Sequence, residues 1–566
     1  MSLNATIRIA AGTLSAMQFG LQVVGNNIAN AGTPGYIRED IVFKPGPPLK
    51  KGNLIFGLGV QVDGIVLKID RFLAERLRDA DSDLRSSETQ QDIYRQLETL
   101  LAGLGDNDLG SSLTSFFGTL HDVVNQPEDA AVRNISILQG EKLAGDIRRL
   151  DQQLKGLYQD VDQEIINLSD SVNRLLERIA ELNVQIVGIE GGGLVDSDAV
   201  SLRDERQLAM SELASIIDIR TVEQDTGSVS VFANGEYLVF DNVFREVESH
   251  SEPGSFGLGR SELRIVASDS PISSGAGRLA GLTISRDEIV GEFINQLDSF
   301  AQSLVYELNK VHSSGQGLSG YQSLTSEFRV SNITNPLDQD ELPFTPVNGS
   351  FQVQVYNSQS NTIETTDVFL SLNGLDDDTS LADLRAALDN IDGLSASTTP
   401  DGKLTITSDS PTVEFTFAND TSGVLAALGL NTFFTGSTAS DIGINQTLLD
   451  DPTKLATSSS GIGQDTVVAQ QLADLLDTAL ESHDDATLAQ LHDRLLIGVT
   501  QGSALVHSVT EGFRSFYEML ESQHLEESGV NIDEEAVKMI TLQRTFQASA
   551  KLITTLNELL EVLVNL

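Results

Sequence analysis

Acidic clusters are the first residues in this chain whose types and spacing could do chemistry. Asp79, Asp81 and Asp83 alternate along the sequence, as the first three ligands of a calcium loop do. Such a loop needs glycine at its sixth position and glutamate at its twelfth, but here the sixth position is not glycine and the twelfth is Gln90. Because the segment also has a helical pattern, we interpret these carboxylates, like those of Asp376 to Asp378, as a solvated acidic surface.

Histidine, glycine and serine patterns give no catalytic site either. His121 has no second histidine one helical turn later, so the zinc-protease pattern is missing. Gly57 and Gly59 are not followed by the further glycine or Gly-Lys pair of a phosphate loop. The sequence contains no cysteine, which excludes a thiolate nucleophile and cysteine-bound metal. We therefore expect no enzymatic activity, no metal and no cofactor.

The composition of the chain limits which kinds of molecule it can bind. The chain has 566 residues, enough for several domains, and 40% of them are hydrophobic. Acidic residues number 82 against 36 basic residues, and the net charge of −46 repels nucleic acid and anionic membranes. No apolar run approaches the length of a membrane span. The first twenty residues contain a single cation, Arg8, and no continuous apolar core, so we expect no cleaved Sec signal peptide.

The two chain ends carry a more informative pattern, a matching apolar repeat. Intervals of four and three residues separate, at the N-terminus, Leu3, Ile7, Ala10, Leu14, Met17, Leu21, Val24 and Ile28. The same intervals separate, at the C-terminus, Met539, Leu542, Phe546, Ser549, Ile553, Leu556, Leu560 and Leu563. A mean spacing of about 3.5 residues is the seam of a coiled coil. We predict that the ends pair as helices and that neighbouring subunits cover the remaining apolar surface, although the repeats could instead form an ordinary core within one subunit.

Further helices are expected between the two ends. The first helix should stop near Asn30, since glycines and a proline follow it. The longest helix, of roughly 50 residues, continues a heptad pattern up to the glycines at 191–193. Other helical patterns cover residues 70–101, 107–125, 201–217, 278–312 and most of the last hundred residues.

Strand patterns lie in three intervening segments. Residues 36–66 are short and extended, and Asn234-Gly235 joins two alternating runs as a β-hairpin. Residues 326–460 form a small α+β module, in which Ser380 and Asp383 are spaced to cap a helix. We predict an α+β multidomain fold with a long helical bundle or coiled-coil core formed by both chain ends and β-rich outer domains. The expected domains are the terminal helices 1–35 and 528–566, a helical rod 36–217, 278–325 and 461–527, a β-rich segment 218–277, and an α+β outer insertion 326–460.

Motifs at both ends resemble those of bacterial flagellar axial proteins. The N-terminal motif is NNIANAGTPGY at 26–36, and the C-terminal one is GVNIDEE at 529–535 with QRTFQASA at 543–550. Two interior stretches, LRDER at 202–206 and GRLAGL at 277–282, resemble the hook-associated protein 1 family. The resemblance covers residues 1–325 and 460–566, whereas Ile37 and Glu39 depart from the family pattern.

This resemblance implies a structural protein that forms the junction ring between hook and filament and is required for filament assembly. It implies secretion through the flagellar type III export channel without a cleaved signal. It also implies contacts with other copies of the chain, the hook subunit, a second hook–filament junction protein, and an export chaperone on the C-terminal helix. The expected assembly interface comprises Leu3, Ile7, Leu14, Met17, Leu21, Val24, Asn27, Ile28, Pro34, Gly35, Tyr36, Met539, Leu542, Phe546, Ile553, Leu556, Leu560 and Leu563.

Two alternatives remain open on the sequence. Another axial protein, such as the hook or distal rod subunit, would share both end motifs but would lack the long helical segment near 128–190. An appendage protein could instead display an adhesive or enzymatic domain in the 326–460 insertion.

Overall fold

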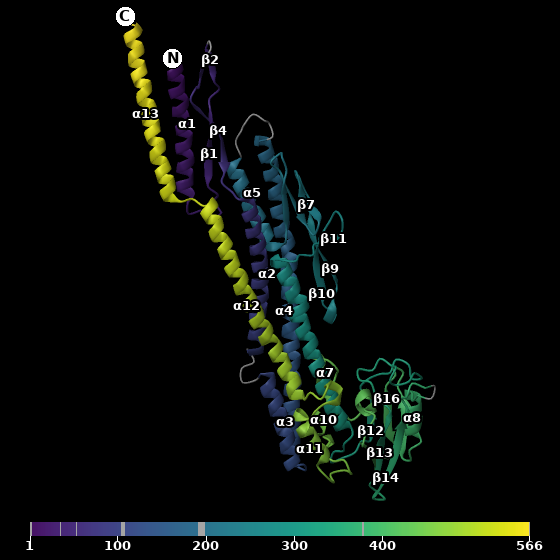
Figure 1. The fold of residues 1–566 in the computed structure, drawn as a ribbon. Helices are drawn as coiled ribbons and strands as arrows, with labels where there is room; N and C mark the ends of the chain where they lie inside the picture. The colour runs from purple at the N-terminus through teal and green to yellow at the C-terminus, as the bar shows by residue number, and fades with distance from the viewer. Residues whose placement is uncertain are drawn as a thin grey trace. The chain divides into compact units, whose positions relative to one another are not determined.

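A computed structural model describes residues 3–33, 35–51, 54–102, 108–190, 199–375 and 378–564. The chain forms two compact units (Figure 1). Unit 1 comprises Met1–Ile93, Gln159–Glu288 and Ala504–Leu566, and unit 2 comprises Tyr94–Tyr158 and Ile289–Ser503. The described helices include none with the length and hydropathy needed to cross a membrane.

Helices form most of the chain. The long ones are α1 (Leu3–Asn30), α2 (Arg71–Ala102), α3 (Leu109–Asn125), α4 (Ala130–Glu190), α5 (Val200–Ile216), α7 (Gly291–Ser313), α12 (Leu488–Ser528) and α13 (Ile532–Val564). Short ones are α6 (Gly277–Ile284), α8 (Leu381–Asp389), α9 (Val424–Leu428), α10 (Gln446–Asp450) and α11 (Val467–Asp474). A π-helical turn, Ser285–Val290, separates α6 from α7. The first helix ends at Asn30 as predicted, whereas α4 has 61 residues and is longer than expected.

The strands of unit 1 form small antiparallel sheets. β1 (Glu39–Pro45) pairs with β4 (Val60–Leu67), and β2 (Leu49–Lys51) pairs with β3 (Leu54–Phe56). A four-stranded sheet follows the order β5 (Arg220–Glu223), β6 (Val229–Ala233), β7 (Glu236–Phe240) and β8 (Val243–Phe244). A three-stranded sheet follows the order β11 (Ser270–Pro271), β10 (Gly259–Ile265) and β9 (Val247–Pro253).

The predicted hairpin joins β6 and β7. Asn234 and Gly235 adopt positive φ values of 49° and 82°, the conformation that a two-residue hairpin turn requires. The side chain of Asn183 on α4 anchors the sheet, because it donates a hydrogen bond to the carbonyl of Val229 over 2.8 Å and accepts one from its amide over 3.0 Å. The hairpin is therefore fixed to a helix of the same unit.

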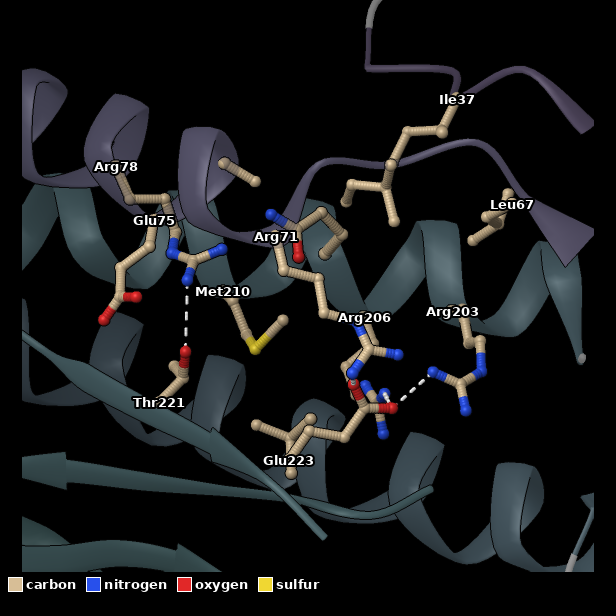
Figure 2. Close-up of a pocket in the computed structure, with 14 residues that line it drawn as sticks. Ile37, Leu67, Arg71, Glu75, Arg78, Arg203, Arg206, Met210, Thr221 and Glu223 are labelled. Atoms are coloured by element: carbon tan, nitrogen blue, oxygen red, sulfur yellow. Dashed lines mark hydrogen bonds and ion pairs between the residues drawn. The ribbon is translucent and has the colours of Figure 1, made fainter. Parts of the chain in front are cut away.

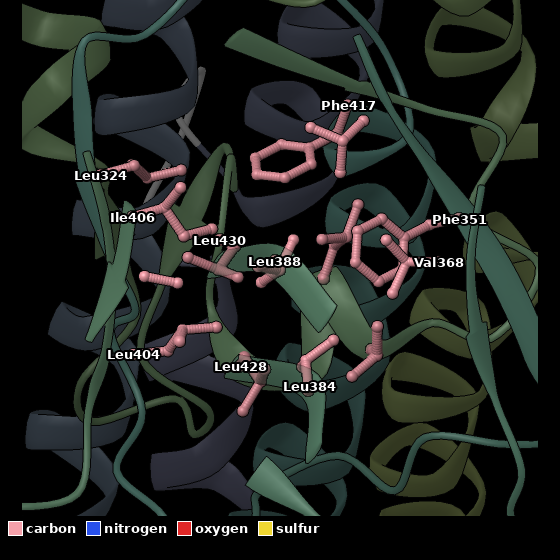
Figure 3. Packing of buried hydrophobic residues seen from close by; sticks show 14 of the residues in the cluster. Leu324, Phe351, Val368, Leu384, Leu388, Leu404, Ile406, Phe417, Leu428 and Leu430 are labelled. Atoms are coloured by element: carbon pink, nitrogen blue, oxygen red, sulfur yellow. The ribbon is translucent and has the colours of Figure 1, made fainter. Parts of the chain in front are cut away.

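Unit 2 contains the remaining strands. One sheet has the order β14 (Thr362–Leu370), β13 (Gly349–Asn357) and β17 (Val413–Ala418), and another has β12 (Ser323–Thr325), β16 (Leu404–Ser408) and β15 (Leu394–Thr398). A short pair joins β18 (Phe434–Thr435) to β19 (Gly443–Ile444). Figure 3 shows the apolar cluster that these sheets enclose with α8, including Phe351, Leu384 and Phe417. Ser380 and Asp383 form the predicted capping box of α8.

A second apolar group in unit 2 gathers around Phe433 and Phe434. The ring of Phe116 on α3 lies 5.4 Å from that of Phe433 and 5.8 Å from that of Phe434, measured between centroids. Arg133 on α4 is fully buried here and donates to the carbonyl of Leu455 over 2.7 Å. Segments that follow the β sheets in sequence thus pack onto α3 and α4.

The overall architecture is the predicted α+β multidomain fold with paired end helices. Strands β9 and β15 are among those that were not predicted. Only Val247 is buried in β9, whereas β15 does alternate, with Leu394 and Ala396 buried, but over only five residues. The four-part division expected from the sequence is finer than the two units and stays a prediction.

Candidate functional site

The chain ends form one structural element within unit 1. Helices α1 and α13 lie side by side, and β1 and β4 pack against α1 (Figure 1). Gly20 marks a close approach between the two helices, because a Cβ atom there would lie 3.0 Å from Cδ1 of Leu542. The two apolar repeats therefore meet along one seam, as a coiled-coil spacing requires.

Burial along this seam is incomplete. Met17, Val24 and Leu556 are buried, with exposed fractions of 7%, 3% and 8%. Partly exposed positions are Ile7, Leu14, Leu21, Ile28, Met539, Leu542, Phe546, Ile553 and Leu560. Leu3 and Leu563 belong to α1 and α13, but their side chains, like all of Pro34, lie outside the described residues. Two helices alone thus leave much of the predicted interface accessible.

Helix α13 carries a second apolar face that the sequence reasoning missed. We call it the outer stripe; its exposed fractions run from 42% to 64%, and its members are Val537, Ile540, Leu552, Leu559 and Val562. At 3.6 residues per turn these positions spread over an arc of about 120° on α13, outside the arc that the seam residues occupy. These exposed apolar side chains contrast with the strongly acidic composition of the chain.

Asn27 is the polar centre where α1, β1 and α13 meet. It is fully buried, and its amide nitrogen donates to the carbonyl of Glu39 over 2.9 Å and to the carboxylate of Glu535 over 3.1 Å. Its amide oxygen accepts from the Glu39 amide over 3.0 Å and from the Tyr36 hydroxyl over 2.9 Å. Both donors and both acceptor positions of this side chain are therefore satisfied.

Arg38 connects the same region to the start of α13. Its guanidinium pairs with Glu535 over 2.7 Å and with Glu534 over 3.1 Å, and its backbone amide donates to the carbonyl of Ser528 over 2.9 Å. Asn531 caps α13, because its side-chain oxygen accepts from the amides of Asp533 and Glu534. Charged groups near the chain turn thus fix where α13 begins relative to β1.

Burial and like charge perturb two acids near this turn. Burial, reinforced by the nearby carboxylate of Glu39, raises the pKa of Asp204 on α5 to about 7, even though the amide of Ile37 donates a hydrogen bond to its carboxylate. The pKa of Tyr36 is raised well above its ordinary value, first by burial and then by Glu39. Its hydroxyl therefore stays protonated and available as a donor to Asn27.

The structure brings together Asn27 and Tyr36 from the predicted set, and Gly35 makes the turn between them with a φ of 77°. The sequence reasoning missed Arg38, Glu39 and Glu535. The only available signal was their position, since Arg38 and Glu39 directly follow the N-terminal motif and Glu535 ends the C-terminal stretch.

The interpretation of the acidic clusters as a solvated surface is wrong for Asp378, which is buried with 7% of its surface exposed. Asp81 lies on α2 and pairs with Arg85 over 3.2 Å, and Asp378 accepts from the amides of Asn373 and Gly374. Asp376 and Asp377 lie outside the described residues. Among the residues that are described, no group of three or more His, Asp or Glu side chains could hold a metal ion.

The three protein families whose models match this chain are all families of flagellar proteins. Residues 94–326 match the flagellar hook-associated protein FlgK helical domain. Residues 7–36 match a family described as flagella basal body rod protein, and residues 521–566 match the flagellar basal body rod FlgEFG protein C-terminal family. The matched termini are thus the segments that form the helix pair.

Individual relatives agree. The chain is 25% identical over 591 aligned residues to flagellar hook-associated protein 1 of Escherichia coli and 26% identical over 600 to that of Salmonella typhimurium, with both proteins covered completely in each case. The solved structure of the flagellar hook junction protein FlgK from Burkholderia pseudomallei aligns with a TM-score of 0.52 at 14% identity, covering 79% of this chain and 99% of that one. That structural likeness supports the fold.

Proposed function

We propose that this chain, a structural component of the bacterial flagellum similar over its whole length to flagellar hook-associated protein 1, is fixed by its paired terminal helices in a ring between hook and filament. The expected interface residues are the contact points in this proposal, together with the outer stripe. Filament assembly then depends on the ring, because the ring supplies the surface on which filament subunits add.

The observation that carries the proposal is the apolar surface that the helix pair leaves uncovered. Seam residues such as Leu14 and Phe546 are only partly buried, and all five members of the outer stripe are exposed. Covering one such side chain contributes about 1–3 kcal/mol. A subunit held by several of these contacts at once would not leave the assembly at a measurable rate.

The polar cluster around Asn27 has a different role in this proposal. The side chain of Asn27 is buried with all of its hydrogen bonds made, and such a group specifies one arrangement rather than many. The bonds of Asn27 and Arg38 set the direction in which the terminal pair leaves the rest of unit 1. They therefore determine how the apolar faces are presented to neighbouring subunits.

The remaining parts of the proposal concern partners and export. The hook subunit, a second junction protein and other copies of this chain are the partners of the terminal pair. We propose secretion through the flagellar export channel without a cleaved signal, with an export chaperone covering α13 beforehand. The role is structural, and we assign the chain no catalytic activity.

Deletion of the gene in its host tests the junction role. We expect electron micrographs to show hooks without filaments, with filament subunits shed into the medium. Loss of the hook itself would instead place the chain in the rod or hook. Intact, motile flagella would contradict any essential structural role.

Complementation of that strain tests the helix pair. Leu14→Asp and Phe546→Asp each put a charge into the seam, and we expect neither variant to be incorporated or to restore filaments. Gln543→Asp is the matched control, since Gln543 is an exposed polar residue on the same helix as Phe546. Equal filament growth with Phe546→Asp and Gln543→Asp would refute the assignment.

A further inference from the structure

Unit 1 contains a cavity with an unusual number of arginines. Its volume is about 260 Å³, and it lies between α2, α5 and β5. Figure 2 shows Arg71 and Arg78 reaching into it from α2, and Arg203 and Arg206 from α5. In a chain with a net charge of −46, a cavity lined by four guanidinium groups is an exception that calls for a cause.

Two of these arginines are balanced by carboxylates. Arg203 binds Glu190 through two nitrogens, over 2.8 and 2.9 Å, and also pairs with Glu223. Arg71 pairs with Glu223 over 2.7 Å. The carboxylate of Glu223 is thus shared at close range between two guanidinium groups.

The other two arginines are buried without a carboxylate at close range, although Glu75 also lines the cavity. Arg78 is 9% exposed, donates to the hydroxyl of Thr221 over 3.1 Å, and forms no ion pair with any carboxylate in the described ranges. Arg206 is 3% exposed, and its closest carboxylate oxygen, on Glu223, is 3.9 Å away. One of its terminal nitrogens donates to the neutral oxygens of Asn183 and Gly227, over 2.8 and 2.7 Å. The Nε atom of Arg206 has no hydrogen-bond partner among the residues that the structure describes.

Burial without a close ion pair is unfavourable for a guanidinium group. Glu75 and Asp79 offset part of this cost for Arg78, and Glu223 and Glu190 offset part of it for Arg206. Burial still lowers the pKa of Arg206 to about 10 and lowers that of Arg78 below its ordinary value. Both groups remain cationic at neutral pH, so an anion in the cavity would relieve the imbalance. The planar fork of arginine donors matches the oxygens of phosphate and similar anions.

We propose that this cavity binds a small tetrahedral oxyanion, held by Arg71, Arg78 and Arg206 with Thr221. The volume exceeds the roughly 30 Å³ occupied by a water molecule several times over, which leaves room for such an anion with its remaining hydration. Because the ligands come from α2, α5 and β5, binding would join three elements of unit 1. The proposal is independent of the role proposed for the terminal helices.

Titration of the full-length chain with inorganic phosphate in chloride buffer tests the site. Binding is measured by calorimetry and by the broadening of the ³¹P line. A parallel titration uses sulfate at equal ionic strength. Saturable binding of either anion supports a site for tetrahedral oxyanions. We expect Arg78→Gln and Arg71→Gln to weaken binding about tenfold or more, since each removes a charged donor. Arg76→Gln is the matched control, because Arg76 is an exposed arginine of α2 outside the cavity.

If Arg78→Gln unfolds the chain, the Arg71→Gln variant still tests the site. The Arg71 side chain is 70% exposed, so we expect its replacement to leave the fold intact. A thermal midpoint that rises with phosphate in the native chain but not in Arg71→Gln would also support the site. Absence of saturable binding by both anions would overturn the proposal. So would equal affinity in the Arg71→Gln and Arg76→Gln variants.

Discussion

Two buried ionisable side chains should make the free energy of unfolding depend on pH. Asp204 lies beside the chain turn that follows α1, where burial and the carboxylate of Glu39 oppose its ionisation. His312 in unit 2 is fully buried between a carbonyl and an amide, since one ring nitrogen contacts the carbonyl of Asn431 and the other accepts from the amide of Ala456. The two residues titrate in opposite senses, so each gives its own pH dependence.

Replacing Asp204 by Asn should stabilise unit 1 above neutral pH. The folded-state pKa of about 7 exceeds the ordinary value of 3.8, so the folded chain holds more protons between these limits and loses stability as pH rises through them. An amide avoids that loss and can still accept from Ile37. We expect a higher thermal midpoint for Asp204→Asn at pH 8 and a shrinking difference toward pH 4. A lower midpoint at pH 8 would contradict this account.

Acid should weaken unit 2 through His312. Burial lowers the pKa of His312 from 6.5 to about 4, so its contribution is intact above pH 6.5 and is lost as pH falls toward 4. The full effect is about 3 kcal/mol. Hydrogen exchange of α7 amides should show the stability gap between the native chain and His312→Gln narrowing by that amount over this range. A gap independent of pH would argue that burial does not control the titration.

At the scale of elements, the α1–α13 pair depends on a close approach at Gly20. Substitution by Leu should push the helices apart, because even a Cβ atom there meets Leu542 at 3.0 Å. Gly25→Leu is the matched control on the same helix, since a Cβ atom at Gly25 meets nothing within 4 Å. We expect faster hydrogen exchange in α13 for Gly20→Leu than for Gly25→Leu. Identical exchange would mean that the two helices do not depend on this contact.

The sequence predicted the elements better than their polar connections. Regular spacing was enough for α1, α13 and the Asn234-Gly235 hairpin, because each follows from local periodicity or turn chemistry. The Arg38–Glu535 pair could not be predicted, since its members are almost the whole chain apart and carry no periodic signal.

The outer stripe escaped prediction for a related reason. Polar residues, among them Arg544, interrupt it between Ile540 and Leu552, so it forms no unbroken heptad. Its apolar character becomes evident only once the helix is seen to present these positions to solvent. Residues of this kind are found from exposure in a structure rather than from spacing in a sequence.

At the scale of the whole molecule, net charge opposes the proposed assembly. Each chain carries −46, so neighbouring copies repel one another, and salt shortens the range of that repulsion. We expect sedimentation of the purified chain to show more self-association as ionic strength rises from about 0.05 M to 0.5 M. Dissociation by salt would indicate that ion pairs, rather than apolar faces, hold the subunits together.

The most direct test of the central claim is photo-crosslinking in isolated flagella, with a benzophenone side chain placed at Ile540 on the outer stripe or at Gln543 between the two apolar faces. The account predicts adducts between Ile540 and a neighbouring axial subunit in assembled flagella, none in the free chain, and far fewer from Gln543. An assembled flagellum in which Ile540 yields no more adduct than Gln543 would show that the terminal helices do not hold the chain in place through this face.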